Sequence, residues 1–192
     1  GSFENQVSAS GISFFSATTL KFVVMSVCTL GIYQLYWFYK NWKLIKERTG
    51  QEIWPFWRAF FCPIWAYSCF KEINSRTGGG LPIGLLAIAY FAISMVWMVP
   101  DPYWIISLFS FLPLMPVNSA ALKFNQHSDA GYVQNGRFTA LNWVGIVVGG
   151  SISILALIGT FAPNAFSSEA AAQIDSPKKY DRGGVAFDYP GN

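Results

Sequence analysis

Side chains suited to acid–base or metal chemistry are few and widely separated in this sequence. His127 is the single histidine, and its nearest acidic neighbour is Asp129. A metal site or a general acid–base site needs further ligands or a nucleophile close by, and the sequence offers none there. Asp101 falls in a different loop, on the other side of an apolar segment, so it does not pair with Asp129. We therefore interpret His127 as a solvated loop residue.

The cysteines and the known catalytic motifs give no more support for an enzyme. Cys28, Cys62 and Cys69 lie in apolar stretches without a CxxC pair, which favours buried free thiols over a disulfide or a metal site. The chain has no GxSxG, HExxH, Walker A or GxGxxG motif. Its clearest apolar segments also lack the buried acidic residue that a proton-coupled transporter needs. The sequence predicts no catalytic residue, no metal site and no cofactor.

Aromatic and basic residues are the ones that recur in a pattern. Such side chains gather where a membrane meets water, because rings suit the polarity gradient and cations meet lipid phosphates. General anchoring is one interpretation, and a site for an anionic lipid or amphiphile is the other. The candidate residues are Trp37, Tyr39, Lys43, Arg48, Arg58, Trp65, Tyr67, Lys71 and Arg76.

Arg58 is the basic residue with the most apolar surroundings, since it lies between Trp57 and Phe60. An arginine at the centre of a bilayer costs on the order of 3 kcal/mol on insertion scales. We expect its guanidinium either to reach the membrane surface or to pair with a carboxylate such as Glu47 or Glu52.

The stretch from Tyr36 to Gly78 contains one pattern twice. W-x-Y-x-x-(W/F)-K-x-I-x-x-R-T-G runs from Trp37 to Gly50 and again from Trp65 to Gly78. Similarity at a fixed offset indicates an internal repeat, although coincidence in an aromatic-rich chain is the alternative.

Composition indicates an integral membrane protein. Of the 192 residues, 53% are hydrophobic and only 12% are charged, whereas an average soluble domain carries about 25% charged residues. The apolar residues form long blocks, and every basic cluster flanks such a block, which argues against nucleic-acid binding. The start of the chain lacks the features of a signal peptide, so we expect no cleavage there.

We expect an all-α membrane protein with three transmembrane helices and two tandem re-entrant or interfacial hairpins. The helical membrane domain covers residues 19–162, between a flexible N-terminus (1–18) and an extracytoplasmic linker that begins a possible further domain (163–192). The hairpins cover residues 20–50 and 51–78, and the spans cover residues 82–99, 103–122 and 140–161.

The basic residues predict the topology. The turn at Asp101 has no lysine or arginine and lies outside, whereas the basic regions 40–76 and 123–137 lie inside. About a dozen residues from Gln51 to Cys62, at ~1.5 Å each, cannot cross a ~30 Å core, so the second unit bends near Pro63 and returns. By analogy the first unit bends near Gly31. The runner-up makes residues 22–42 a full span, which gives four spans and one hairpin.

Small residues recur on one face of the last span. Gly145, Gly149 and Ser153 are spaced by four, a pattern that lets helices approach closely. This face either binds a partner or packs against the protein's own helices.

The segment from Thr29 to Lys46 resembles a family of uncharacterised bacterial multi-pass membrane proteins with the signature T-x-G-(I/L)-Y-x-(I/L)-Y-W-F-Y-(K/R)-N-W. Residues 55–61, 65–70 and 101–104 look like the same family, so the likeness covers roughly residues 14–161. The resemblance implies no known activity. The tail from Tyr180 resembles the first strand of a small domain found in relatives of the photosystem subunit PsbP.

These patterns predict a non-catalytic scaffold or accessory subunit of the bacterial inner membrane. Its expected partners are membrane lipids and other membrane subunits or a second copy of itself, with no nucleic acid. The alternative is a binder or transporter of lipid-like amphiphiles that uses the aromatic and basic hairpin region.

Overall fold

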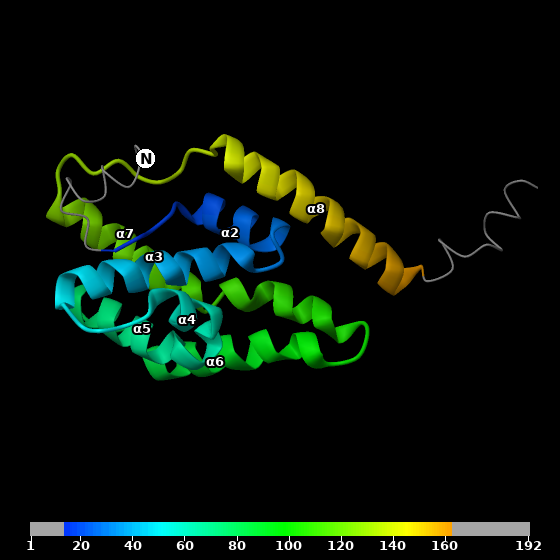
Figure 1. The fold of residues 1–192 in the computed structure, drawn as a ribbon, viewed down its shortest axis with the longest axis horizontal. Coiled ribbons are helices and arrows are strands. Elements are labelled where there is room, and N and C mark those ends of the chain that lie inside the picture. Colours follow the sequence, from blue (N-terminus) through cyan, green and yellow to red (C-terminus); the bar gives the residue numbers. More distant parts are fainter. Residues whose placement is uncertain (1–13, 163–192) are drawn as a thin grey trace, which may run out of the picture.

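The structure, a computed structural model, describes residues 14–162, whose regular elements are all helices and which contain no strand. The predicted linker and the strand-like tail lie outside the described residues. Figure 1 shows α3 in the middle of the bundle, with α2 and α8 on one side and α4, α5 and α6 on the other. The elements are α2 (Thr19–Cys28), α3 (Ile32–Thr49), α4 (Pro55–Phe60), α5 (Cys62–Arg76), α6 (Ile83–Met95), η1 (Val96–Met98), η2 (Tyr103–Phe111), α7 (Leu114–Ser128) and α8 (Ala140–Phe161).

The first unit of the repeat is a helical hairpin, α2–α3, whose bend is at Gly31. This residue has φ +87°, a left-handed conformation that glycine adopts without steric cost. The two helices pack against each other, as ring contacts between them show. The ring of Phe22 on α2 lies 5.9 Å from that of Tyr33 and 6.1 Å from that of Trp37, both on α3. A single continuous helix over residues 22–42, as the runner-up topology requires, is therefore wrong.

The second unit, α4–α5, is interrupted at Phe61, two residues before the proline that the sequence marks as the bend. Pro63 instead lies within the first two positions of α5, where a missing backbone N–H leaves no hydrogen bond unmade. The six-residue α4 packs on α3, and α5 packs on α3 and α6. We call α2–α3 the first hairpin and α4–α5 the second hairpin.

Both hairpins finish at the same end of the bundle. Left-handed Gly50 (φ +65°) ends α3, and left-handed Gly78 (φ +95°) follows α5. The Nη2 of Arg48 in the last turn of α3 lies 2.6 Å from the Oε1 of Glu72 near the end of α5. A side-chain bond between the two helix ends requires them to be neighbours.

Within residues 14–162, two helices are long and apolar enough to cross a membrane: the continuous helix Tyr103–Ser128, formed by η2 and α7, and α8. The bounds of α8 coincide with the expected last span, and the second expected span is extended to Ser128. The apolar helix Ile83–Met98, which corresponds to the span expected at 82–99, is shorter than the ~20 residues that a helix needs to cross a bilayer. Length and composition thus identify two candidate spans among the described residues and do not confirm the third expected one.

The N-terminal stretch is packed from Phe14 onward, so the prediction of a flexible segment up to residue 18 is wrong for residues 14–17. Phe14, Phe15, Ser16 and Ala17 are all at most 5% exposed. Their apolar side chains are buried among α3 and α7, and their backbone groups are bonded by buried amides. Residues 1–13 lie outside the described part of the chain.

Candidate functional site

Exposed aromatic rings form a patch on α4. Trp57 stacks on Phe61 with ring centroids 6.2 Å apart, and Phe56 stacks on Phe60 at 6.3 Å. Trp57 and Phe60 also meet edge to face, so the rings hold one another in place. We call this patch the aromatic platform, and its members are Trp54, Phe56, Trp57, Phe60 and Phe61, all exposed by 46% or more.

Arg58 lies beside the platform but points to the opposite side of α4, towards α3 and α5. Its guanidinium carbon lies 4.5 Å from the centroid of the Trp42 ring and 4.5 Å from that of the Trp65 ring. The cation is thus held between two aromatic faces, an arrangement that favours a partly desolvated charge. The expected carboxylate partner is not seen among the described residues, and the expectation that Arg58 reaches the membrane surface stays a prediction.

Arg48 and Arg76 converge on one carboxylate, that of Glu72. Arg48 lies 2.6 Å from Glu72 Oε1, and Arg76 Nε lies 3.6 Å from the same atom. Burial lowers the pKa of Arg48, the nearby charge of Arg76 lowers it further, and the bond to Glu72 opposes both effects. These three residues connect the ends of α3 and α5, and we call them the clamp.

The other candidate residues of the repeat do not gather in one place. Trp37 is fully buried, whereas Trp65 is 37% exposed. Tyr39 and Tyr67 are exposed on the outer surfaces of their helices, 36% and 48% respectively. Lys43 is half-buried and Lys71 exposed. The repeat therefore distributes its aromatic and basic side chains along two helices and forms no single binding site.

Buried asparagines form a hydrogen-bond network that the sequence reasoning missed. Asn118 on α7 accepts from the Ala17 N–H (3.1 Å) and donates to the Ala17 carbonyl (2.8 Å). Asn41 on α3 bonds both backbone groups of Phe15 in the same way, at 3.0 Å each. Each amide side chain thus pairs with a peptide unit as a neighbouring β-strand would.

Two further bonds extend this network. Trp37 donates its indole N–H to Asn118 Oδ1 at 3.1 Å, and Asn125 donates to the Phe14 carbonyl at 2.7 Å. We call Asn41, Asn118 and Asn125 the amide ladder. The signal available in the sequence was their presence in otherwise apolar helical segments, where a polar side chain must find a partner.

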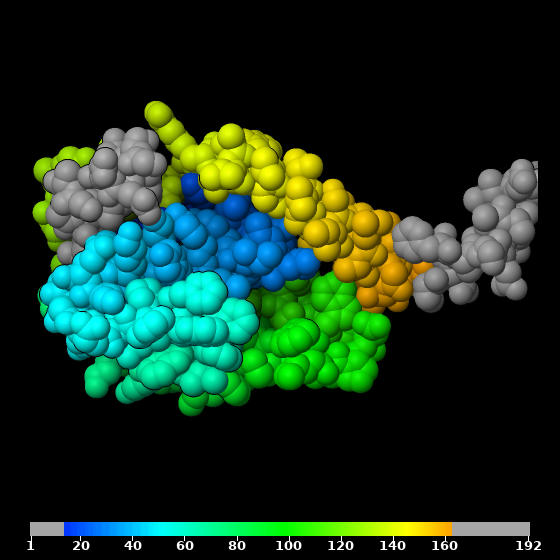
Figure 2. All heavy atoms as spheres, in the orientation of Figure 1, coloured from blue at the N-terminus to red at the C-terminus, as the bar shows by residue number. Residues whose placement is uncertain are grey.

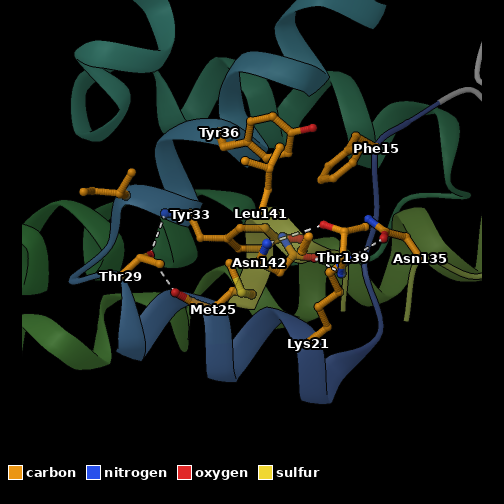
Figure 3. A pocket seen from close by; sticks show the side chains of 12 residues that line it. Phe15, Lys21, Met25, Thr29, Tyr33, Tyr36, Asn135, Thr139, Leu141 and Asn142 are labelled. Carbon is orange, nitrogen blue, oxygen red and sulfur yellow. Dashed lines mark hydrogen bonds between the residues drawn. The ribbon is translucent and has the colours of Figure 1, made fainter. Parts of the chain in front are cut away.

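A cavity of about 600 Å³ lies between α2, α3 and the start of α8 (Figure 3). Its lining is mainly apolar, with polar groups from Lys21, Asn135, Thr139 and Asn142. Lys21 is only 4% exposed, and burial lowers the pKa of its ammonium group. Neither this cavity nor the smaller one beside His127 is lined by Arg58, around which the sequence suggested an amphiphile site.

The small-residue face of α8 packs against α2 of the same molecule. A Cβ added to Gly149 would collide with the Cys28 carbonyl oxygen, and one added to Gly145 would lie 3.5 Å from Thr29 Cγ2. The hydroxyl of Ser153 donates to the Gly149 carbonyl of its own helix at 2.8 Å. Of the two interpretations of this face, the structure favours contact with the protein's own helix.

The side chains suited to catalysis stay apart within residues 14–162. The Nδ1 of His127 lies 2.8 Å from the Lys123 carbonyl oxygen, one turn earlier in α7. Cys62 lies 3.0 Å from the Tyr90 hydroxyl, and Cys69 is fully buried. No group of three or more His, Cys, Asp or Glu side chains that could hold a metal occurs in this part of the chain.

Comparison with known proteins gives no relative: no family model, no curated protein and no solved structure matches this chain. The resemblance to the bacterial membrane family, and that of the tail to PsbP relatives, remain predictions from the motifs. Function must accordingly be argued from the chain's own geometry.

Proposed function

We propose that this chain is a non-catalytic scaffold or accessory subunit of a bacterial inner membrane, and that the aromatic platform binds another membrane protein. The observation that carries the proposal is the platform itself, with five large rings exposed on and beside one six-residue helix. Tryptophan and other aromatic residues are enriched at the energetic centres of protein interfaces. Because the rings already contact one another, they lose little conformational freedom on binding.

The proposed topology keeps three spans and two re-entrant hairpins. The helix Ile83–Met98 would complete the third span, since a bilayer can thin around a short apolar segment at modest cost. Both hairpins would enter from the cytoplasmic side, on which the Arg48–Glu72–Arg76 clamp, Lys123 of α7 and Arg137 would also lie. The chain after α8 would then be extracytoplasmic.

The amide ladder supports a structural rather than a catalytic role for the interior. Apart from the Oδ1 of Asn125, its side-chain polar atoms bond the backbone of residues 14–17 or neighbouring side chains and thereby hold the fold. Exposed apolar surface, in contrast, is abundant on α4, α6 and α8, where lipid or a partner protein can cover it.

A matched pair of double variants tests the proposal. Phe56→Ser with Phe60→Ser removes two platform rings, and Leu85→Ser with Ile88→Ser removes similarly exposed apolar side chains from α6. We expect the wild type and the α6 variant to purify from native membranes with a second protein in fixed stoichiometry, and the platform variant to lose it. A wild type that carries no second protein, or a platform variant that keeps it, would contradict the proposal.

A further inference from the structure

The cavity beside α8 has one polar end and one apolar wall. Lys21, Asn135, Thr139 and Asn142 provide the polar end. The wall is lined by Phe15, Met25, Ile32, Tyr33, Tyr36 and Leu141. In the space-filling view α2 lies beside α3 and below α8 (Figure 2). A volume of about 600 Å³ is within the range of small-molecule sites in proteins.

Lys21 brings a positive charge to the polar end without a matching negative one. Its Nζ donates to Asn135 Oδ1 and to the Arg137 carbonyl oxygen, both at 2.7 Å and both neutral. Among the residues that the structure describes, no carboxylate forms an ion pair with Lys21. An ammonium group has three N–H donors, so one remains for a further acceptor.

The N-terminus of α8 adds a second source of positive potential. Ala140, Leu141 and Asn142, the first residues of this 22-residue helix, line the cavity, and no acidic residue occupies its first turn. The positive end of the helix dipole therefore lies at the same place as the Lys21 charge. Both features favour an anion.

An unpartnered hydroxyl group supplies an independent observation. Tyr33 lines the cavity and is 5% exposed, yet its buried hydroxyl has no hydrogen-bond partner. Figure 3 shows its ring extending from α3 towards the start of α8, while Lys21 approaches from α2. A buried polar group without a partner calls for an explanation, and a bound ligand provides one.

We propose that this cavity binds an anionic phospholipid of the surrounding bilayer. The headgroup phosphate accepts from Lys21, and one acyl chain lies along the wall formed by Met25, Ile32 and Leu141. A phospholipid with net negative charge is preferred over a zwitterionic one, because the polar end carries only positive potential to attract a headgroup. The inference rests on the membrane placement proposed above but not on the protein partner.

Binding of two lipids with identical acyl chains to the detergent-solubilised, delipidated full chain tests this inference. Native mass spectrometry and thermal unfolding should both show tighter binding of phosphatidylglycerol than of phosphatidylcholine, by about tenfold. Both phosphates can accept from Lys21, but the positive potential of the polar end repels the choline cation. Lys21→Met should remove this preference. Lys123→Met, which removes an exposed charge on α7 outside the cavity, should leave it unchanged.

Tyr33→Phe keeps the test informative if Lys21→Met disturbs the fold. Since the hydroxyl has no partner in the protein, the lipid-free variant should unfold at or above the wild-type temperature. Its affinity for phosphatidylglycerol should fall about threefold, the effect of one neutral hydrogen bond. Equal binding of both lipids to the wild type, or lipid preference that survives Lys21→Met, would overturn the inference. Equal stabilisation by glycerol phosphate alone would also overturn it, because the site would then bind a free phosphate.

Discussion

The two hairpins share one buried helix face and differ on the other. At equivalent positions of the repeat, α3 and α5 bury Trp42 and Phe70, and likewise Ile45 and Ile73. Beyond this common face, α3 buries Trp37 completely, whereas its counterpart Trp65 is 37% exposed. The first hairpin thus packs on the second hairpin and on α8, and its Trp37 bonds Asn118 of α7. The second hairpin packs on α3, α6 and α7 but leaves the ring of Trp65 partly open.

The shared face also differs in chemistry, because α3 carries amide side chains at two positions where α5 carries thiols. Asn41 and Gln34 on α3 correspond to Cys69 and Cys62 on α5. Asn41 holds the backbone of Phe15, and Gln34 donates to Ser110 Oγ at 3.0 Å. Cys69 is instead a small, fully buried side chain that allows close packing. One repeat pattern therefore yields a central hairpin that organises other segments and a peripheral hairpin available for binding.

Among the substitutions that test this difference between the hairpins, disrupting the amide ladder should lower the stability most. Asn118→Ala leaves the Ala17 N–H, the Ala17 carbonyl and the Trp37 indole N–H without a partner in a buried site. We expect the free energy of unfolding, measured by SDS titration in micelles, to fall by about 3 kcal/mol or more. Asn74→Ala removes a half-buried acceptor for the Leu81 N–H and should cost about 1 kcal/mol. Equal losses for both variants would contradict a special role for the ladder.

The contact of the first hairpin with α8 should be nearly as sensitive. Gly149→Ala introduces a methyl group into the Cys28 carbonyl oxygen, and overpacking of this kind typically costs about 1–3 kcal/mol. Gly150→Ala adds a methyl group where no atom lies within 4 Å, and the greater helix propensity of alanine should stabilise α8 by up to about 1 kcal/mol. Thermal unfolding should therefore shift in opposite directions for these adjacent substitutions. Shifts of the same sign for both variants would contradict the close contact between Gly149 of α8 and Cys28 of α2.

The paired tryptophans allow a direct comparison of the two hairpins. Trp37→Phe removes a buried indole that donates to Asn118, and we expect a loss of about 2 kcal/mol in unfolding free energy. Trp65→Phe retains a ring beside Arg58 and should cost about 0.5 kcal/mol. If the second substitution proves as costly as the first, the two hairpins are equally embedded.

The clamp between the hairpins should have the smallest effect. Glu72→Gln leaves Arg48 and Arg76 without their common carboxylate, and the expected loss is about 1 kcal/mol because both pairs are partly exposed. Raising the salt concentration should reduce the difference from the wild type. A loss that is independent of salt would mean that Glu72 acts through packing.

Composition and the repeat could predict the helical class, the bounds of α8 and a bend at Gly31, since these depend on local chain chemistry. The packing of residues 14–17 could not be predicted, because it arises from amides on α3 and α7 that lie far along the chain. The same holds for Lys21, whose partners come from the loop before α8. Arg58 was recognised as unusual, but its position between Trp42 and Trp65 requires three helices to be in place.

Cysteine labelling with a membrane-impermeant maleimide tests the central claim, that both hairpins leave and return to one side of the membrane. The native Cys28, Cys62 and Cys69 are first changed to serine or alanine. One cysteine is then introduced in each variant at an exposed position, by Gln51→Cys, Ser75→Cys or Asp101→Cys. The account predicts that positions 51 and 75 are labelled from the cytoplasmic face and position 101 from the opposite face. Labelling of positions 51 and 75 from opposite faces would contradict it.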